Sequence, residues 1–515
     1  MVRGRPGMVR RGALALVMGL LAPFLAPEDA EPADASMTLC GRRDLPETGV
    51  PGDVPMADQR SGRADLGYNC GLAVVGHSSL GGRGNNANMA WSGDCAYIAG
   101  AGVAVVDVSD PADPKHVTTL HTGGTEASLE TIHAVDAPDR SILVAGRYGI
   151  GGANGFPGMA PVDVFDVSDC TRPTLLSTIQ FPSNVHNLTL TADGRRVWST
   201  LPLQAADISD PRRPVLLGSP EPQIAEQSPH LQYAHEAWPS PDGTRLYIGN
   251  QNPFEVEALL VVDIEGWPAR PAQVLGGVSW PAHSLRPMQI DGKPYLLASD
   301  ESIVNYAANG CLPDKLTPFA GVARPAIIDI SHEMLPRIRS QLRLPINDPK
   351  HCVEQLASGV NASGHYHEVD DPEDTTFAMV SMWNAGLRIF DVRDPDHPRE
   401  VAYFNPGRFE PEAPFQGSPG ISWATGLTGL SGLDRAWAHT RYRPDTGHLW
   451  LTTATGGFWV LELEPQVRDA LDLPDRPATH PQGAPARPPS TRGMAATVPS
   501  ALLPTYCAIS TARVL

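Results

Sequence analysis

The sequence lacks the short motifs of several common catalytic and nucleotide-binding sites. It contains no G-x-S-x-G nucleophile turn, no G-x-x-x-x-G-K-[ST] phosphate loop, no H-E-x-x-H zinc motif and no C-x-x-C pair. Aromatic residues make up 6% of the chain, and 7 of its 515 residues are cysteine. After the N-terminal region, no apolar run is long enough to cross a bilayer. Any activity must therefore come from residues that the fold brings together.

Basic residues are also scarce. The 39 Lys and Arg are outnumbered by 57 Asp and Glu, which gives a net charge of −18. This charge repels the phosphate backbone of nucleic acids and anionic membrane surfaces. We therefore expect neither as a partner, and interpret the protein as a monomer that meets a small molecule, or an extracellular protein or glycan.

The N-terminus has the organisation of a secretory signal. Arg3, Arg5, Arg10 and Arg11 precede an apolar stretch from Ala13 to Ala26, and small residues follow at positions 33–35. We predict a signal peptide at residues 1–35, an N-terminal extension at 36–67, and a secreted, periplasmic or cell-surface location. In such an oxidising compartment the cysteines can form disulfides.

A strand-and-turn pattern recurs along the chain. An apolar run ending in Asp is followed by a turn containing Pro, which fixes its own φ and cannot donate a ladder hydrogen bond. The copies are GVAVVDVSDPADP, VDVFDVSDCTRP, LQAADISDPRRP, LLVVDIEGWPARP, PAIIDISHEMLP and LRIFDVRDPDHP, with a shortened GFWVLELEP near residue 457. The 49 Gly and 51 Pro reflect the number of turns these units need.

A second feature precedes each of these runs. A strand-like segment opens on a polar residue and is followed by a turn such as PDGT and a second strand. The opening residues are Asn88, His133, His186, His235, His283, His367 and His439. The chain therefore contains seven units of short strands, six of them with four strands each.

Seven such units predict an all-β, seven-bladed β-propeller of four-stranded antiparallel blades, because radial repetition protects the strand edges. The runs VAVVDVSDP and LRIFDVRDP resemble the LVIVD-repeat family of secreted and surface proteins. The resemblance covers roughly residues 68–465 and implies a repeat architecture without fixing an activity.

The last unit lacks a fourth strand, while residues 70–80 look like a fourth strand with no unit before them. We predict that Leu72 to Val75 pair with Phe458 to Leu463 and close the ring. The propeller should occupy residues 68–465. Residues 466–515, rich in Pro and Ala, are interpreted as a disordered tail.

The predicted topology suggests how the cysteines pair. Cys311 and Cys352 fall in loops on the same face, so we predict a disulfide between them if their Cα atoms lie within about 7 Å. Cys70 and Cys95 form a second candidate pair. Cys507, in the tail, is the expected odd thiol.

The repeated histidines mark one mouth of the central channel, because the first strand of each blade lines it. Neutral imidazoles bind transition metals, so we predict a Cu, Zn or Fe site there. The candidate ligands are His133, His186, His235, His283, His365, His367 and His439. The alternative is that each histidine bonds the backbone of the next blade and closes the channel without a metal.

Other polar residues are predicted to lie on the same face, together with loops at 146–161, 300–324, 344–364 and 405–436. The predicted rim consists of Asn88, Arg147, Tyr148, Glu236, Asn250, Gln251, Asp300, Glu301, Trp383 and Asn384. Glu130, Glu236, Asp300 and Glu301 are candidate acids or bases, although any of them could be an ordinary surface carboxylate.

Two functional hypotheses follow. In the first, a secreted propeller binds a metal ion or small ligand at the histidine-lined mouth and carries out oxidase or hydrolase chemistry. In the second, a non-catalytic adhesion or scaffold module binds a protein or glycan through the loop-rich face. The sequence does not decide whether the protein is an enzyme.

Overall fold

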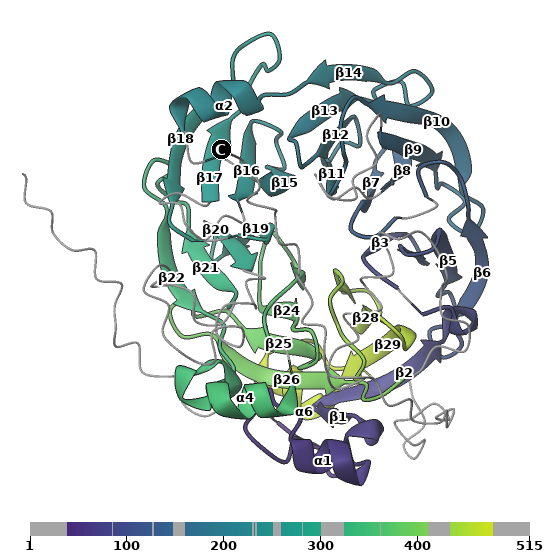
Figure 1. Ribbon diagram of the computed structural model, residues 1–515, viewed down its shortest axis with the longest axis vertical. Helices are drawn as coiled ribbons and strands as arrows, with labels where there is room; N and C mark the ends of the chain where they lie inside the picture. The colour runs from purple at the N-terminus through teal and green to yellow at the C-terminus, as the bar shows by residue number, and fades with distance from the viewer. Residues whose placement is uncertain are drawn as a thin grey trace, which may run out of the picture.

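Each repeat in the sequence forms one antiparallel sheet, and the sheets stand radially around a central channel (Figure 1). In this computed structural model the described residues are 39–476 except 85, 126–127, 148–159, 229–230, 232–233, 251–258, 281, 300–323, 361 and 410–432. These residues form seven sheets, which confirms the predicted seven-bladed β-propeller. The predicted signal peptide lies outside the described residues, as does most of the predicted tail.

The strands run from the channel outward in each blade. Blade one contains β3 (Met89–Ser92), β4 (Cys95–Ile98), β5 (Val103–Asp107) and β6 (Lys115–Leu120). Blade two contains β7 (Ile132–Ala137), β8 (Arg140–Gly146), β9 (Ala160–Asp166) and β10 (Thr174–Phe181). Blade three contains β11 (Leu188–Leu190), β12 (Arg196–Ser199), β13 (Gln204–Asp207) and β14 (Val215–Gly218). Blade four contains β15 (Ala234–Pro239), β16 (Arg245–Asn250), β17 (Leu259–Asp263) and β18 (Gln273–Val278).

The remaining blades follow the same order. Blade five contains β19 (Ser284–Ile290), β20 (Lys293–Ser299), β21 (Ala326–Asp329) and β22 (Arg337–Gln341). Blade six contains β23 (His367–Val369), β24 (Phe377–Ser381), β25 (Leu387–Asp391) and β26 (Arg399–Asn405). Blade seven contains β27 (Arg441–Arg443), β28 (His448–Thr453), β29 (Gly457–Leu463) and, from the N-terminal part of the chain, β2 (Leu72–Ser78).

The third strand of a blade ends at an aspartate that bonds the turn after it. Asp107 Oδ1 accepts a hydrogen bond from the amide of Ser109 at 2.9 Å, and Asp207 Oδ1 accepts one from Ser209 at 2.8 Å. Asp329 repeats the contact with Ser331 in blade five. Such side-chain turns stop the strand and start the Pro-containing connection. This is the physical basis of the repeat seen in the sequence.

Pairing between β2 and β29 closes the ring, as predicted. The two strands are antiparallel, with Leu72 opposite Leu463 and Ser78 opposite Phe458. Both strands lie next to each other at the lower edge of the ring in Figure 1, although one is purple and the other yellow. Strand β2, from the N-terminal part of the chain, and β29, the last strand of the propeller, therefore belong to one sheet.

A further N-terminal strand, which the sequence analysis did not predict, extends blade six. Strand β1 (Tyr68–Cys70) pairs with β26, with Asn69 opposite Phe404. This makes blade six a five-stranded sheet. One continuous N-terminal segment therefore contributes strands to blades six and seven.

Helical segments are short and lie outside the sheets (Figure 1). They are α1 (Met56–Ser61), η1 (Ala64–Leu66), η2 (Leu80–Gly82), α2 (Glu221–Gln227), η3 (Pro345–Asn347), η4 (Pro349–His351), α4 (Cys352–Ser358) and α6 (Pro465–Ala470). Within the described residues, no helix is long and apolar enough to cross a membrane. Helix α6 packs Val467 and Leu471 into the core. The tail was expected to begin at residue 466. This was wrong, because the buried side chains of Val467 and Leu471 hold residues 466–471 against the core.

Two disulfides differ from those predicted. Cys40 pairs with Cys70 and Cys95 pairs with Cys170, so the candidate Cys70–Cys95 bond was wrong. The reason is packing between distant segments: Cys40 lies beside β1, and β4 of blade one meets the turn after β9. Cys352 is also disulfide-bonded. Its predicted partner Cys311 lies outside the described residues, as does Cys507.

A buried ion triad attaches the N-terminal extension to blade six. Arg388 on β25 is fully buried and contacts Glu47 of the extension and Glu400 on β26, the latter at 2.9 Å. Its guanidinium also stacks over Tyr403, 4.6 Å from the ring centroid. Both carboxylates depend on this single cation, since both are buried.

We predict that Arg388→Met lowers the free energy of unfolding by about 3–5 kcal/mol, because it leaves two buried carboxylates without a cation. The triple variant with Glu47→Gln and Glu400→Gln should recover most of that loss. Urea denaturation measures both. Arg339→Met removes a pair with Asp396 that is partly exposed, and should cost less than about 1 kcal/mol. An equally small loss in Arg388→Met would contradict the assigned role of the triad.

Candidate functional site

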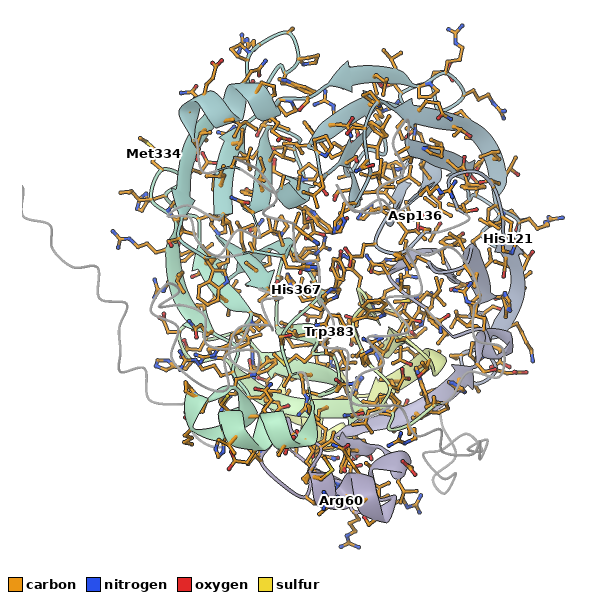
Figure 2. The ribbon with its side chains drawn as sticks, in the orientation of Figure 1. Arg60, His121, Asp136, Met334, His367 and Trp383 are labelled. Carbon is orange, nitrogen blue, oxygen red and sulfur yellow. A yellow bond between two sulfur atoms is a disulfide. The ribbon has the colours of Figure 1, made fainter. Side chains whose placement is uncertain are left out.

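The first strands of the blades, β3, β7, β11, β15, β19, β23 and β27, each stand at one end of their sheet, and most of them contact the first strand of a neighbouring blade around the axis of the ring. The repeated histidines stand at or just before the starts of these strands. Figure 2 shows His367 and Trp383 near the middle of the ring, whereas Met334 lies on its outer edge. The structure places the predicted histidines in different environments: one group surrounds Glu130, His439 belongs to a second group, and His133 and His367 bond the backbone.

The first group surrounds the buried carboxylate of Glu130 and is called the Glu130 cluster. Its members are Glu130, His186, His235, His283 and His365, all at most 5% exposed. Glu130 Oε2 lies 3.0 Å from His186 Nε2 and 3.6 Å from His235 Nε2. The two Nε2 atoms are hydrogen-bonded to each other at 2.7 Å. A carboxylate oxygen from the segment before β7, a nitrogen from the segment before β11 and a nitrogen from β15 therefore lie close together inside the protein.

A backbone contact fixes the protonation of His235. Its Nδ1 lies 2.8 Å from the carbonyl oxygen of His283. Because a carbonyl oxygen can only accept, Nδ1 carries the proton, and in the neutral ring Nε2 then presents its lone pair to the cluster. His235 is the extra residue at a register shift between Ala234 and Glu236 in β15. Such a bulge re-aims side chains, so that His235 and Glu236 both reach the channel.

Burial and neighbouring groups set the charges in the cluster. Desolvation lowers the pKa of His235 to about 3, so this imidazole is neutral. Desolvation alone would raise the pKa of Glu130, but His186, His235 and His365 lower it to about 2. The cluster therefore combines an ionised carboxylate with neutral imidazole nitrogen.

Two further histidines complete the Glu130 cluster on the other side of the carboxylate. His365 Nε2 lies 3.8 Å from Glu130 Oε1. Its Nδ1 donates to the carbonyl oxygen of Trp437. The ring of His283 lies between those of His235 and His365, at centroid distances of 3.8 and 4.3 Å. Burial keeps the pKa of His283 well below its usual value.

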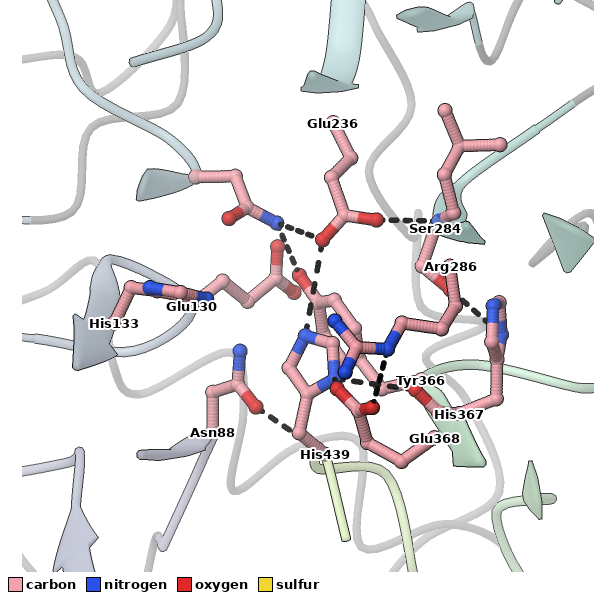
Figure 3. A network of polar contacts seen from close by, with 12 residues as sticks. Asn88, Glu130, His133, Glu236, Ser284, Arg286, Tyr366, His367, Glu368 and His439 are labelled. Atoms are coloured by element: carbon pink, nitrogen blue, oxygen red, sulfur yellow. Dashed lines mark hydrogen bonds and ion pairs between the residues drawn. The ribbon is translucent and has the colours of Figure 1, made fainter. Parts of the chain in front are cut away.

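The second group, called the channel network, links charged side chains of several blades (Figure 3). Its members are Asn187, Glu236, Arg286, Tyr366, Glu368 and His439. His439 lies between the carboxylates of Glu236, at 3.7 Å, and Glu368, at 3.3 Å. Arg286 Nε pairs with Glu368 at 2.8 Å. Each buried charge in this network has an opposite charge beside it.

The carboxylates of the channel network change the pKa of His439. Desolvation would lower it, but hydrogen bonds and attraction from Glu236 and Glu368 raise it to about 9. For Glu368, burial raises the pKa, but Arg286 and His439 bring it below its usual value. Burial raises the pKa of Glu236. His439 is therefore an imidazolium at neutral pH.

Tyr366 is the member of the channel network that contacts the Glu130 cluster. Its hydroxyl accepts a hydrogen bond from Asn187 Nδ2 at 2.8 Å, and the same amide lies 3.4 Å from Glu236. Its ring centroid is 4.7 Å from that of His365 and 4.4 Å from that of His439. The ring thus separates the Glu130 cluster from the channel network.

The other predicted ligands bond to the protein backbone. His367 Nε2 lies 2.9 Å from the carbonyl oxygen of Leu297, and its Nδ1 lies 3.1 Å from Ser284 Oγ. His133 Nδ1 accepts from the amide of Leu190 at 3.4 Å. Contacts of this kind join neighbouring blades. The structure does not bring His133, His367 or His439 into the Glu130 cluster.

The predicted rim residues lie in several environments. Asn88 accepts from the amide of His439 at 2.9 Å and so connects blades one and seven. Glu236, Asn250, Trp383 and Asn384 are buried, and Arg147 is half-buried. Tyr148, Gln251, Asp300 and Glu301 lie outside the described residues. The surface interpretation of Glu130 and Glu236 was wrong, because both are at most 5% exposed.

Sequence reasoning missed four members of the channel network, namely Asn187, Arg286, Tyr366 and Glu368. Asn187, Glu236 and Glu368 each follow directly after a repeated histidine. That recurrence was the available signal. Alternate residues of a regular strand face opposite sides, so the residue after a channel-facing histidine was expected to point away from the channel. The bulge in β15 breaks this alternation.

The fold defines the chain as a seven-bladed β-propeller. The family model of the LVIVD repeat matches residues 83–122, which contain the strands of blade one, and this confirms the resemblance. No curated protein matches the chain.

Several solved propellers are similar to this chain. The Cps50 (Swd1) β-propeller domain of Myceliophteria thermophila is 12% identical, over 74% of this chain and 96% of that one, with a TM-score of 0.46. Hydrazine synthase of Kuenenia stuttgartiensis is 12% identical, over 73% and 95%, with a TM-score of 0.41. An ancestral GH74 enzyme is 10% identical, over 76% and 48%, with a TM-score of 0.46. At these values the similarities carry no functional argument.

The raised pKa of His439 predicts a pH dependence of stability. Its contribution is fully present below the unfolded value, about 6.5, and is lost as the pH rises through the folded value of about 9. Urea denaturation of the wild type and His439→Gln from pH 6 to 10 should show their stability difference shrinking over that interval. His397→Gln, whose imidazole pairs with Asp394 at an exposed position, is the control and should change the free energy of unfolding by less than about 1 kcal/mol at every pH of the series. A constant difference for His439→Gln would contradict the assigned charge.

Proposed function

We propose that the protein is an exported β-propeller that binds a transition metal ion through Glu130, His186 and His235. The ion would act on a small molecule by oxidation or hydrolysis. One observation carries the proposal: two imidazole nitrogens and a carboxylate oxygen converge on one another in the protein interior, at separations of 2.7, 3.0 and 3.6 Å.

These separations fit a shared ion. Metal–nitrogen and metal–oxygen bonds of about 2.0–2.2 Å in a tetrahedron place neighbouring donor atoms about 3.3 Å apart. The two distances from Glu130 Oε2, 3.0 and 3.6 Å, lie around that value, and the hydrogen-bonded nitrogens, now 2.7 Å apart, would move apart by about 0.6 Å to share an ion. Glu130 Oε2 is buried and receives no hydrogen bond of good geometry, although His186 Nε2 lies 3.0 Å away. A cation between the three atoms would satisfy this oxygen.

The hydrogen bonds around the cluster support metal binding. The carbonyl of His283 holds His235 with its Nε2 lone pair toward Glu130 and His186. Metal-ligating histidines commonly donate their other ring N–H to a carbonyl or carboxylate in this way, because the contact fixes the tautomer and the ring orientation.

The number of donors favours a reactive ion over a structural one. Structural zinc sites use four protein ligands, whereas catalytic sites use three and leave a position for water or substrate. Such an ion would polarise a bound oxygen or, if copper or iron, exchange electrons with the substrate. Tyr366 and the channel network would form the polar surroundings of that substrate.

The disulfides support export. Bonds such as Cys95–Cys170 form and persist in oxidising compartments. The hypothesis of an adhesion or scaffold module depends on loops that lie mostly outside the described residues, and no contact among the described residues favours it. The metal hypothesis rests on side chains whose positions are described.

Elemental analysis of the exported protein, purified without a His-tag or chelator, tests the proposal. The wild type should carry copper, zinc or iron. Glu130→Gln and His235→Ala should each weaken binding beyond the roughly 10- to 100-fold loss typical of removing a partner of a ligand. His367→Gln is the matched control, because His367 is equally buried but bonds Leu297 and Ser284. It should keep the metal. A metal-free wild type, even after incubation with each ion, would overturn the proposal.

A further inference from the structure

We propose that the Glu130 cluster holds two metal ions and that the carboxylate of Glu130 bridges them. This inference rests on the proposed function, since it adds a second ion to the same site. The second set of ligands is Glu130, His283 and His365.

The two oxygens of Glu130 face different histidines. Oε2 is the oxygen nearest to His186 and His235, at 3.0 and 3.6 Å. Oε1 is the oxygen nearest to His365, at 3.8 Å. A carboxylate that binds a single ion needs imidazole ligands beside only one of its oxygens, whereas Glu130 has them beside both. Its position between two sets of nitrogen donors is that of a bridging ligand.

The donor atoms form two sets of three. The first set consists of one ligand atom each from Glu130, His186 and His235, and these atoms lie within 4.8 Å of one another. The second set consists of one ligand atom each from Glu130, His283 and His365, and it meets the same limit. Glu130 is the shared member. Two donors of one ion can be at most about 4.2 Å apart, which is twice the bond length. The distances between the ligand atoms of each set are therefore close to those that a single shared ion allows.

The second set also has its orientation fixed by the backbone. His365 Nδ1 donates to the carbonyl oxygen of Trp437, so Nε2 is the atom left on the side of Glu130. The same arrangement holds His235 in the first set. A histidine of each set is therefore oriented toward the same carboxylate by a main-chain carbonyl.

The ring spacing matches a pair of ions. His235 belongs to the first set and His283 to the second, and their ring centroids are 3.8 Å apart. Two-metal sites in proteins hold their ions about 3.5–4 Å apart. Ligands stacked at this distance can each bind a different ion of such a pair.

The charge of the pair indicates what else it would bind. Two divalent ions bound here would be offset by the single negative charge of Glu130. Glu236 and Glu368 pair with His439 and Arg286 in the channel network and do not offset the ions. A small anion with oxygen donors, such as hydroxide or a substrate carboxylate or phosphate, would supply the missing negative charge and occupy the open positions of both ions.

Copper(II) tests the inference, because imidazole sites bind it well and its unpaired electron reports a neighbouring ion. The full-length wild type is freed of metal, loaded with Cu²⁺ and desalted. Copper is then counted by mass spectrometry, and the spins are counted by electron paramagnetic resonance. We expect two ions per chain and a spin count well below the copper count, since bridged ions couple magnetically.

The variants separate the two ions. His283→Ala/His365→Ala should leave one copper with a full, isolated signal, and His186→Ala/His235→Ala should do the same with different spectral parameters. Circular dichroism and thermal unfolding confirm that each variant folds. The wild-type count is decisive even if a variant does not fold.

Each other result for the wild type overturns the inference. One copper with an isolated signal would refute the second ion and leave the proposed function standing. Two coppers with a full spin count would show separate sites and refute the bridge. No bound copper would refute the inference, and if the elemental analysis of the exported protein also finds no zinc or iron, the proposed function is refuted as well.

Discussion

The pairing of β2 with β29 is the constraint on which the rest of the structure depends. Blade seven has only three strands from the C-terminal part of the chain, and it is completed by hydrogen bonds between β29 and β2, which lie nearly four hundred residues apart. Asn88 adds a contact across the same seam by accepting from the amide of His439. The positions of the channel side chains follow from this closure, because each inner strand is held between two neighbours.

The interior of the channel shows two ways of burying charge. In the channel network, Glu236 and Glu368 face His439 and Arg286, so acids and bases balance within the protein. In the Glu130 cluster, an ionised carboxylate meets the imidazoles of His235 and His283, whose pKa values burial lowers. A buried charge without a full counter-charge is costly. The difference between the two groups is the reason for assigning a ligand to one and a structural role to the other.

The sequence predicted the fold well because its signals were local. The aspartate at the end of the third strand bonds the next turn within two residues, so each blade could be recognised separately, and the unmatched strands at the two ends indicated closure. The disulfides were not predictable, because Cys95 meets Cys170 only through the packing of two blades.

The site was predicted only in part for a similar reason. The repeat places a histidine at the same point of several blades, but its partners differ from blade to blade. His367 meets a carbonyl of its neighbour, His439 meets two acids, and His235 meets Glu130. Glu130 itself lies just before β7 and outside the repeated pattern. Strand β1, which has no counterpart in the other blades, also left no periodic signal.

The placement of β1 and β2 has a consequence for biosynthesis. These strands are among the first parts of the propeller to be made, yet their partners β26 and β29 are among the last. Until then their edges have no ladder partner, and exposed edges invite pairing with other chains. Contacts between such distant residues also form slowly. The edges of β1 and β2 therefore become protected only when the C-terminal blades have been made.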